Sequence, residues 1–172
     1  MELRDIYDID RIPQNRTSVR GDSIKPGDYI MVVHACIFNS AGQMLIQRRH
    51  SSKKAWGGYW DVSVGGAAIA GENSREAIQR ELKEELGVDI DFSQKRPAMT
   101  MNFERGFDDF YLLCADLELD SLRLQSDEVS DVRWAGMDEL LSMIDGGEFV
   151  PFFKSMIELM FDTRNKPDCL NI

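Results

Sequence analysis

The chain has 172 residues, of which 43% are hydrophobic, and its formal net charge is −10 at pH 7. This length suits one globular domain with a substantial core. The negative charge argues against nucleic acid as the main partner, but it permits small phosphorylated substrates, because a bound metal ion inverts the local charge. We expect no leader and no membrane contact, since no charged-then-apolar start and no long apolar run is present. Three cysteines without CxxC spacing, Cys36, Cys114 and Cys169, favour free thiols and a cytoplasmic location.

The first third of the chain predicts an extension followed by strands. Residues 1–29 are polar with short apolar patches, which indicates an irregular lead-in or a hairpin that packs on the main domain. Glycine and proline near its end indicate a loop. Apolar runs and alternating stretches then predict three strands, the first two of them joined as a hairpin. These strands are expected over residues 30–38, 43–49 and 60–64.

The segment Gly66–Val88 is the most informative part of the chain. Asn73 is a suitable N-cap, and Glu76 lies three residues further on, as in a capping box. Gly87 suits the left-handed position that follows a helix. A helix is therefore predicted over about residues 74–86. Its buried stripe consists of apolar residues that recur every four positions: Ile78, Leu82 and Leu86.

Three carboxylates, Glu81, Glu84 and Glu85, fall within five positions beside this stripe. Packing three anions so closely costs free energy unless a cation neutralises them. A hard divalent metal is the obvious candidate, because it takes oxygen ligands, and such a metal is most useful for handling phosphates. Arg80 lies at the same end of the segment, where a bidentate pair with Glu72 would hold the preceding loop.

The last part of the chain predicts further strands and two helices. Asp108 and Asp109 are interpreted as turn residues that open a strand, with Asp109 alternatively acting as an acid that activates water. Pro151 is expected in the first turn of the last helix. Strands interrupted by one central helix and followed by two more predict an α/β protein. The expected strands are 98–103, 110–115 and 132–134, and the expected helices are 137–144 and 150–161.

Residues 48–60, RRHSSKKAWGGYW, are locally basic in an acidic chain. Their cations are candidates for binding a diphosphate, although an exposed loop after an edge strand fits them equally well. His34 lies within an apolar strand, which favours a packed, hydrogen-bonded role over metal ligation. The four candidate phosphate-binding residues are Arg48, Arg49, Lys53 and Lys54.

The segment from Gly66 to Val88 matches every specified position of the Nudix box: Gly, five residues, Glu, seven residues, Arg-Glu, an aliphatic, any residue, Glu-Glu, any residue, Gly and an aliphatic. A Glu-x-x-Glu-Glu triplet alone is typical of a solvated helix face, but the full pattern rarely arises by chance. The chain therefore resembles a Nudix hydrolase. That resemblance implies a Nudix fold, with a mixed β-sheet sandwiched between α-helices. The expected organisation is an N-terminal extension over 1–29, a Nudix domain over 30–163 and a C-terminal tail over 164–172.

The resemblance also implies an activity and a site. Family members typically cleave a nucleoside diphosphate linked to another group, using Mg²⁺ or Mn²⁺. We expect a metal-dependent pyrophosphatase that attacks a small organic diphosphate with water at phosphorus, and the family makes a homodimer a natural guess. Either Glu81 or Asp109 would accept the proton of the water. The implied catalytic residues are Arg80, Glu81, Glu84 and Glu85, and the implied metal ligands are these three glutamates with the backbone carbonyl of Gly65.

Two other interpretations compete with hydrolysis. Residues 48–60 also resemble isopentenyl diphosphate isomerases through the pattern RRxxSKKAWxGxW. Those enzymes need a catalytic cysteine, which is replaced here by Gly65, and a histidine, which is replaced by Ala67. A nucleotide-binding module without turnover is the third interpretation, but the acidic positions are intact. The sequence does not specify the diphosphate, the number of metal ions or the oligomeric state.

Overall fold

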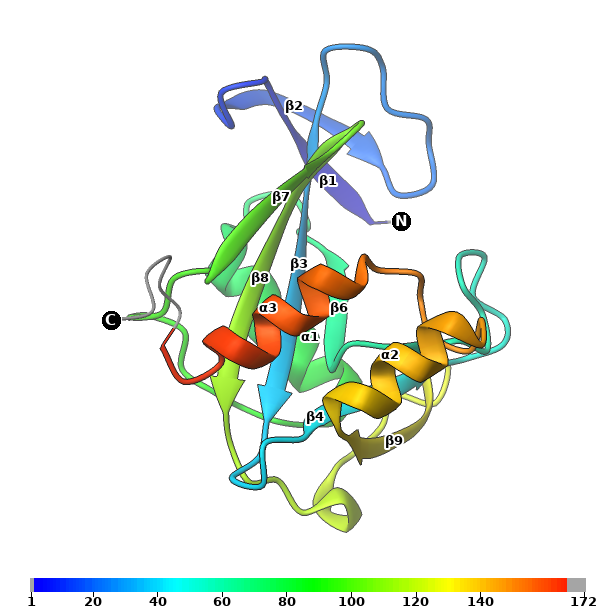
Figure 1. Ribbon diagram of the computed structural model, residues 1–172. Helices are drawn as coiled ribbons and strands as arrows, with labels where there is room; N and C mark the ends of the chain where they lie inside the picture. The colour runs from blue at the N-terminus through cyan, green and yellow to red at the C-terminus, as the bar shows by residue number, and fades with distance from the viewer. Residues whose placement is uncertain (1, 167–172) are drawn as a thin grey trace.

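The structure, a computed structural model, describes residues 2–166, so part of the expected C-terminal tail, residues 167–172 with Cys169, lies outside the described residues. Figure 1 shows a sheet crossed by helices, with a separate hairpin at one end. The strands are β1 Leu3–Tyr7, β2 Pro13–Val19, β3 Ile30–Phe38, β4 Met44–Arg49, β5 Trp60–Asp61, β6 Val64–Ala67, β7 Met99–Phe103, β8 Gly106–Cys114 and β9 Val129–Ala135. The helices are α1 Ser74–Leu86, α2 Met137–Asp145 and α3 Lys154–Thr163, with a 3-10 turn at Leu119–Ser121.

The main sheet is mixed and has seven strands among the described residues. Its path is β5-β4-β3-β8-β7, with β6 also paired to β3 and β9 to β4. β3 and β8 run parallel over their whole length, from Ile30 opposite Gly106 to Phe38 opposite Cys114. β3 meets β4 only where Phe38 faces Met44, because β6 occupies its edge at residues 32–35. The expected hairpin between the first two strands of the domain is therefore reduced to a single pair of residues.

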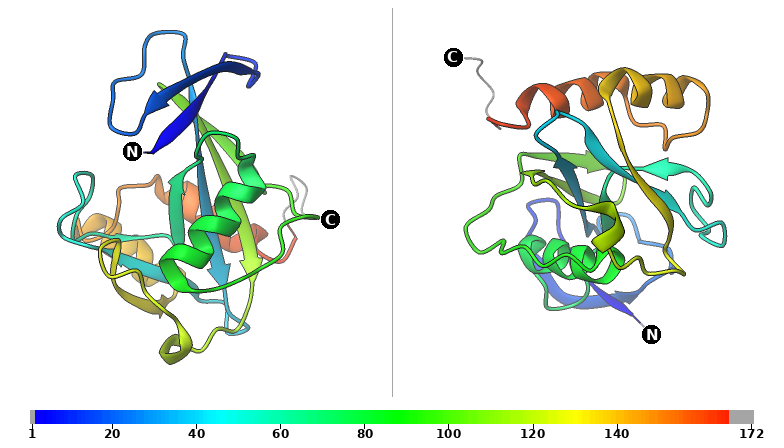
Figure 2. Two further views of the ribbon diagram at one scale, coloured as in Figure 1. Left: turned by 180° about the vertical axis from the view of Figure 1, so that it is seen from behind. Right: turned by 90° about the horizontal axis from the view of Figure 1, so that it is seen from below.

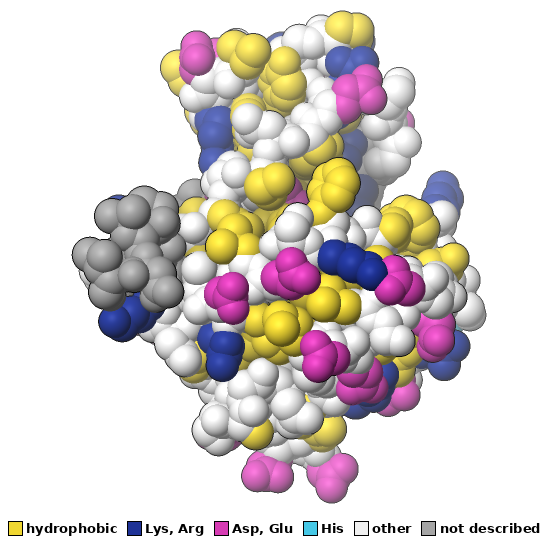
Figure 3. Space-filling view, viewed as in Figure 1, with side chains coloured by type: hydrophobic (Ala, Val, Ile, Leu, Met, Phe, Trp, Pro, Cys, Tyr) yellow, Lys and Arg dark blue, Asp and Glu magenta, His cyan; other side chains and the backbone are white. Residues whose placement is uncertain are grey.

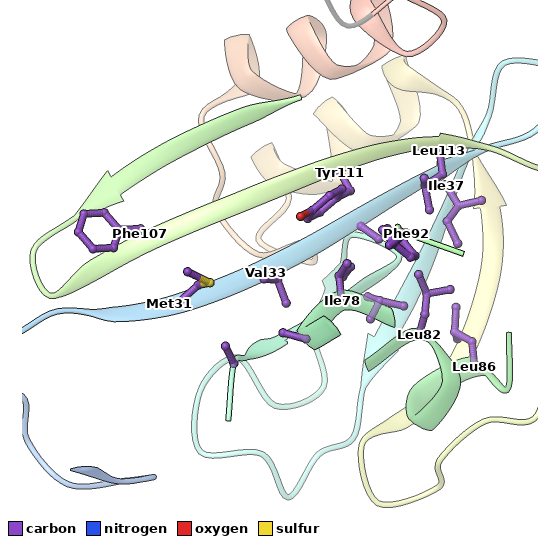
Figure 4. Close-up of a cluster of buried hydrophobic side chains, with 14 of the residues drawn as sticks. Met31, Val33, Ile37, Ile78, Leu82, Leu86, Phe92, Phe107, Tyr111 and Leu113 are labelled. Carbon is purple, nitrogen blue, oxygen red and sulfur yellow. The ribbon is translucent and has the colours of Figure 1, made fainter. Parts of the chain in front are cut away.

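Helices cover both faces of this sheet, as Figure 2 shows, with α1 on one side and α2 and α3 on the other. The side chains of Ile78, Leu82 and Leu86 point from α1 into a fully buried cluster with Val33 and Tyr111 (Figure 4). A second cluster fills the space between the sheet and the other two helices. The α/β architecture expected from the sequence, a mixed sheet sandwiched between helices, is confirmed.

Helix α1 has the bounds and caps that the sequence predicts. The side chain of Asn73 accepts hydrogen bonds from the backbone N–H groups of Arg75 and Glu76, and the Glu76 carboxylate accepts one from the N–H of Asn73. Gly87 ends the helix in the left-handed conformation, with φ of 70°. Such local bonds satisfy groups that a helix end leaves without partners. These caps fix both ends of α1 and thereby hold its acidic face in one orientation.

The expected strand over 60–64 is divided into β5 and β6, and the buried hydroxyl of Ser63 explains the division. Its Oγ donates to the carbonyl of Leu45 at 2.6 Å and accepts from the N–H of Ile37 at 2.8 Å. Ser63 thus bridges β3 and β4 at the point where their own ladder is interrupted. At Ser63 the chain leaves the edge of β4, where β5 pairs, and reaches the edge of β3, where β6 pairs.

Two further expectations were wrong. Asp108 and Asp109 lie inside β8 instead of in a turn, since the parallel pairing with β3 begins at Gly106. The last helix begins at Lys154, so Pro151 lies outside it. The segment before this helix is held extended, because the N–H of Val150 donates to the carbonyl of Trp60 at 2.8 Å. A residue that precedes proline is in any case disfavoured in a helix.

The extension over residues 1–29 contains the β1–β2 hairpin, which lies beside the start of β3 (Figure 1). Tyr7 exchanges backbone hydrogen bonds with Tyr29, and the N–H of Ala70 donates to the carbonyl of Leu3 at 2.8 Å. These bonds tie the hairpin to the start of β3 and to the loop that leads into α1. Among the described residues, no helix combines the length and apolar character needed to cross a membrane.

Candidate active site

A polar cavity of about 80 Å³ lies where α1, the N-terminal hairpin and the loop before β9 meet. Five of its side chains are carboxylates and two are guanidiniums, so negative charge is in excess. Such crowding of anions is costly unless a cation compensates it. The lining residues are Glu2, Arg20, Arg80, Glu81, Glu84, Glu85, Gln125 and Glu128.

Helix α1 supplies three of these carboxylates from successive turns. Glu81 and Glu85 are buried, with 6% and 4% of their surface exposed, whereas the side chain of Glu84 is 50% exposed. A Cβ atom on Gly66 would lie 2.0 Å from Oε1 of Glu81, so only glycine permits the Glu81 carboxylate to lie against β6. The first glycine of the Nudix-like pattern and its first metal-ligand position are thus in direct contact.

Arg80 uses every donor of its guanidinium, which has five N–H groups. Its Nε and Nη2 donate to the two carboxylate oxygens of Glu72 at 2.7 and 3.0 Å. Nη2 also donates to the carbonyl of Ala67, and Nη1 donates to Glu81 at 2.9 Å and Glu84 at 3.0 Å. The bidentate pair with Glu72 that the sequence predicts is present. Arg80 is also the cation that partly neutralises the acidic face of the helix.

Among residues 2–166, Glu85 is the cavity carboxylate that has no cationic partner at hydrogen-bond distance. Its Oε2 accepts from the neutral amide of Gln47 at 3.0 Å. Burial, and after it the charge of Glu81, raise the pKa of Glu85 to about 8. Burial also raises the pKa of Glu81, although the charge of Arg80 opposes this effect.

The donor set of the cavity fits a hard divalent cation. Carboxylate oxygens are the ligands that Mg²⁺ and Mn²⁺ prefer, and a buried, unpaired carboxylate such as Glu85 gains most from a bound cation. Within residues 2–166, no three acidic, histidine or cysteine side chains converge as a ready-made metal cluster. Nη1 of Arg80 bonds Glu81 and Glu84, so an ion held by these two carboxylates would have to compete with the arginine for them.

The basic loop does not line this cavity. Arg49 donates to Asp61 at 3.0 Å and to a backbone carbonyl of the loop, so it holds the loop against β5. Lys53 pairs with the side chain of Glu128, which lines the cavity. Two of the four predicted phosphate-binding residues therefore already have carboxylate partners.

The other two members of the basic loop lie apart from the acidic cavity. Nε of Arg48 donates to the carbonyl of Gly58 at 3.1 Å, and Arg48 lines a separate cavity of about 240 Å³ together with Trp60 and Glu148. Lys54 is exposed. The structure thus distributes the four cations of the basic loop between two places, and among the described residues none of them forms a hydrogen bond or an ion pair with the glutamates of α1.

His34 lies directly under Gly65, on the neighbouring strand. Its Nδ1 is 2.6 Å from Oδ1 of Asp108, and its ring stacks on Phe110 at 4.9 Å between centroids. Burial lowers the pKa of His34, but the charge and hydrogen bond of Asp108, together with the charges of Asp61 and Glu85, raise it overall. A Cβ atom on Gly65 would lie 2.3 Å from the His34 ring. The packed, hydrogen-bonded role expected for His34 is confirmed, and His34 explains why residue 65 is glycine.

Asp109 points to the opposite face of β8 and is 1% exposed. Nη1 and Nη2 of Arg11 donate to its two oxygens at 3.0 and 2.8 Å, and Thr100 donates to Oδ1 at 2.6 Å. Burial would raise the pKa of Asp109, but these hydrogen bonds outweigh it and hold the pKa below the usual range for aspartate. Asp109 therefore anchors the hairpin, and both of its oxygens already accept hydrogen bonds from other side chains.

Sequence reasoning missed several residues that the fold brings into the cavity. Glu2 and Arg20 arrive on the N-terminal hairpin, and Gln125 on the loop before β9. Nothing near them in the sequence resembles a motif, because the α1 glutamates of the cavity lie 40 or more positions away from each of them. Only the contacts of the folded hairpin reveal them.

Comparison with known proteins agrees with this fold and site. The family model for the NUDIX domain matches residues 28–153. An uncharacterized Nudix hydrolase of Listeria innocua is 43% identical over 165 residues, which are 96% of each chain. The crystal structure of DR0079 from Deinococcus radiodurans has a TM-score of 0.75 and 30% identity, covering 92% of this chain and 97% of that one. The isopentenyl-diphosphate delta-isomerase of Escherichia coli is 34% identical over 117 residues, or 63% of each chain.

The chain therefore belongs to the Nudix hydrolase family and is a Nudix phosphohydrolase. Membership implies hydrolysis of nucleoside diphosphate derivatives, with divalent metals as the general requirement of the family. The resemblance stated from residues 66–88 is confirmed, and so is the likeness to the isomerase branch.

Proposed function

We propose that the protein is a metal-dependent hydrolase that cleaves the diphosphate linkage of a nucleotide or another small organic diphosphate. The observation that carries the proposal is the polar cavity at α1, where two buried carboxylates and a third at the rim exceed the available positive charge. Glu81, Glu84 and Glu85, with the carbonyl of Gly65, would hold Mg²⁺ or Mn²⁺. When bound, the ion polarises a phosphoryl oxygen and makes a water molecule more acidic.

The protein's own residues would then direct the chemistry. The water oxygen attacks phosphorus, the bridging P–O bond breaks, and the water gives up its proton to a carboxylate. We assign this proton transfer to Glu81, because it lines the cavity. Hydrogen bonds from Arg11 and Thr100 lower the pKa of Asp109 and so make it a weaker base. Arg80 would act by holding Glu72 and the loop before α1 in place.

The basic loop would contribute to substrate binding at the edge of the site. Lys53 supports this role because it pairs with Glu128 of the cavity. Arg48 is consistent with this role because it lines the separate cavity beside Trp60, which is large enough to hold part of the substrate's organic group. The complete proposed set is Arg48, Arg49, Lys53 and Lys54.

The test is a phosphate-release screen over many diphosphates with Mg²⁺ and with Mn²⁺. Glu84→Gln and Glu85→Gln are each expected to lower turnover by orders of magnitude, because removing an interaction that stabilises the transition state costs about 10²–10³ in rate. Glu158→Gln, an exposed glutamate on α3, is the matched control. Near-normal turnover in either α1 variant would contradict the assignment.

Isomerisation of isopentenyl diphosphate is the second candidate, and the similarity to the Escherichia coli isomerase favours it. Glycine at position 65 and alanine at position 67 argue against it, because protonating a carbon–carbon double bond needs a positioned acid. Dimethylallyl diphosphate formed without phosphate release would establish the isomerase. Tight nucleotide binding without cleavage across the screen would instead favour a sensing module. A cytoplasmic location and a homodimer also stay predictions, testable by fractionation and by sedimentation.

A further inference from the structure

We propose that Arg20, which the N-terminal hairpin carries into the acidic cavity, binds a phosphate of the diphosphate substrate. Arg20 lies outside residues 28–153, which the NUDIX family model matches. The inference rests on the proposed function, because it names a substrate-binding residue of that same site.

Arg20 is held in position by its backbone. It directly follows β2, and its N–H donates to the carbonyl of Glu2 at 2.9 Å. The hairpin is anchored at its other end by the bidentate pair between Arg11 and Asp109. The guanidinium of Arg20 therefore projects from a hairpin fixed at both ends, which limits the entropy lost when the side chain binds a ligand.

Counting donors separates Arg20 from the other arginine of the cavity. All five N–H groups of Arg80 already donate hydrogen bonds, to Glu72, Glu81, Glu84 and a backbone carbonyl. In residues 2–166 the side chain of Arg20 makes one hydrogen bond, from Nη1 to Glu2 at 2.6 Å. Its remaining N–H groups are available, and its side chain is 44% exposed. A guanidinium with free, forked donors is well suited to phosphate oxygens.

The charges around Arg20 agree with this role. The carboxylates of Glu81 and Glu128 act on Arg20 through space, yet neither forms a hydrogen bond with it. A phosphate that enters between these carboxylates meets strong repulsion unless a cation faces it. Among the cavity residues that the structure describes, Arg20 is the cation that keeps donors for this purpose.

The experiment compares Arg20→Gln and Arg20→Lys with Arg16→Gln. Arg16 belongs to the same hairpin, pairs with Asp28 and does not line the cavity, so it controls for general effects on the hairpin. Steady-state kinetics use the best diphosphate from the screen. Calorimetry with Mg²⁺ uses methylenediphosphonate, which is not hydrolysed. Thermal unfolding checks that each variant is folded.

We expect Arg20→Gln to raise KM and weaken methylenediphosphonate binding by about ten- to a hundredfold, the range for losing a hydrogen bond to a charged group. The effect on kcat should be smaller, Arg20→Lys should recover part of the affinity, and Arg16→Gln should behave as wild type. Unchanged KM and affinity in folded Arg20→Gln would overturn the inference while leaving the hydrolase intact.

The two proposals fail in different ways. A wild-type protein that binds methylenediphosphonate through Arg20 but cleaves no diphosphate would overturn the proposed hydrolysis and support the role of Arg20. A wild-type protein that neither binds nor cleaves would overturn both.

Discussion

Among single residues, Arg80 connects the fold to the chemistry. It joins the loop before α1 to the acidic face of the helix through five hydrogen bonds, two of them to Glu72. Lysine keeps the charge but has three donors on one atom, so it cannot reproduce a planar, bidentate pair. The identity of the residue, and not only its charge, should therefore matter at this position.

We predict that Arg80→Lys lowers turnover at least tenfold and reduces the free energy of unfolding by about 1–3 kcal/mol, the range for hydrogen bonds to charged groups. Urea unfolding in EDTA measures the stability apart from metal binding. Arg75→Lys is the matched control, because Arg75 lies on the same helix and its side chain makes a single hydrogen bond within residues 2–166, to the carbonyl of Ser93. Equal behaviour of the two variants would contradict the role given to Arg80.

Asp109 leads to a prediction about pH. Burial raises its pKa, but the hydrogen bonds from Arg11 and Thr100 prevail and the pKa in the folded state is lowered. The ionised carboxylate is therefore favoured by folding. Its contribution is fully present above the ordinary aspartate pKa of about 4 and disappears as the pH falls through the lower pKa of the folded state.

We expect Asp109→Asn to destabilise the protein near neutral pH and to flatten the fall in unfolding free energy below about pH 4. Urea unfolding at a series of pH values measures both effects. Asp10→Asn, an exposed residue of the same hairpin, serves as the control. An unaltered pH dependence in Asp109→Asn would show that the pair with Arg11 does not stabilise the fold.

At the scale of secondary-structure elements, α1 depends on its N-terminal cap. The Asn73 side chain accepts hydrogen bonds from two backbone N–H groups at 3.0 and 3.2 Å. Asn73→Ala should therefore cost about 1 kcal/mol of stability, as such caps typically do. Asn73→Asp keeps the accepting oxygen and should retain most of that stability. Equal urea midpoints for wild type and Asn73→Ala would contradict the importance of the cap.

The elements also show what the sequence can and cannot predict. Helix α1 was predicted with its bounds and caps because Asn73, Glu76 and Gly87 act within a few residues of one another. The division between β5 and β6 was not, because it depends on the contacts of Ser63 with two other strands. The late start of α3 depends in the same way on the bond of Val150 to Trp60.

The same distinction applies to the candidate site. Glu81, Glu84 and Glu85 were identified because one helix carries all three in a fixed spacing. Arg20 was missed, because the hairpin that brings it to those glutamates is remote in sequence. Site residues that one helix carries can be identified from a sequence pattern. Site residues that a separate segment brings to the cavity can be identified only from the folded structure.

At the scale of the whole molecule, the net charge of −10 is unevenly distributed. On the face over α2 and α3, acidic and basic side chains are interspersed among apolar ones (Figure 3). In the cavity at α1, five carboxylates face two guanidiniums. A cation that enters this cavity relieves repulsion present only in the folded state. Divalent ions should therefore stabilise the fold by mass action.

We predict that Mg²⁺ at a hundred times its dissociation constant adds about 2.7 kcal/mol of stability, which corresponds to a rise in Tm of about 5–10 °C for a chain of this size. NaCl at equal ionic strength should produce a much smaller rise, and EDTA should reverse the effect of Mg²⁺. Glu85→Gln removes one of two adjacent buried carboxylates, so its Tm in EDTA should equal or exceed that of wild type, while its response to Mg²⁺ should be largely lost. Glu158→Gln should respond as wild type does. An identical Mg²⁺ response in wild type and Glu85→Gln, measured by thermal unfolding, would show that the ion binds elsewhere.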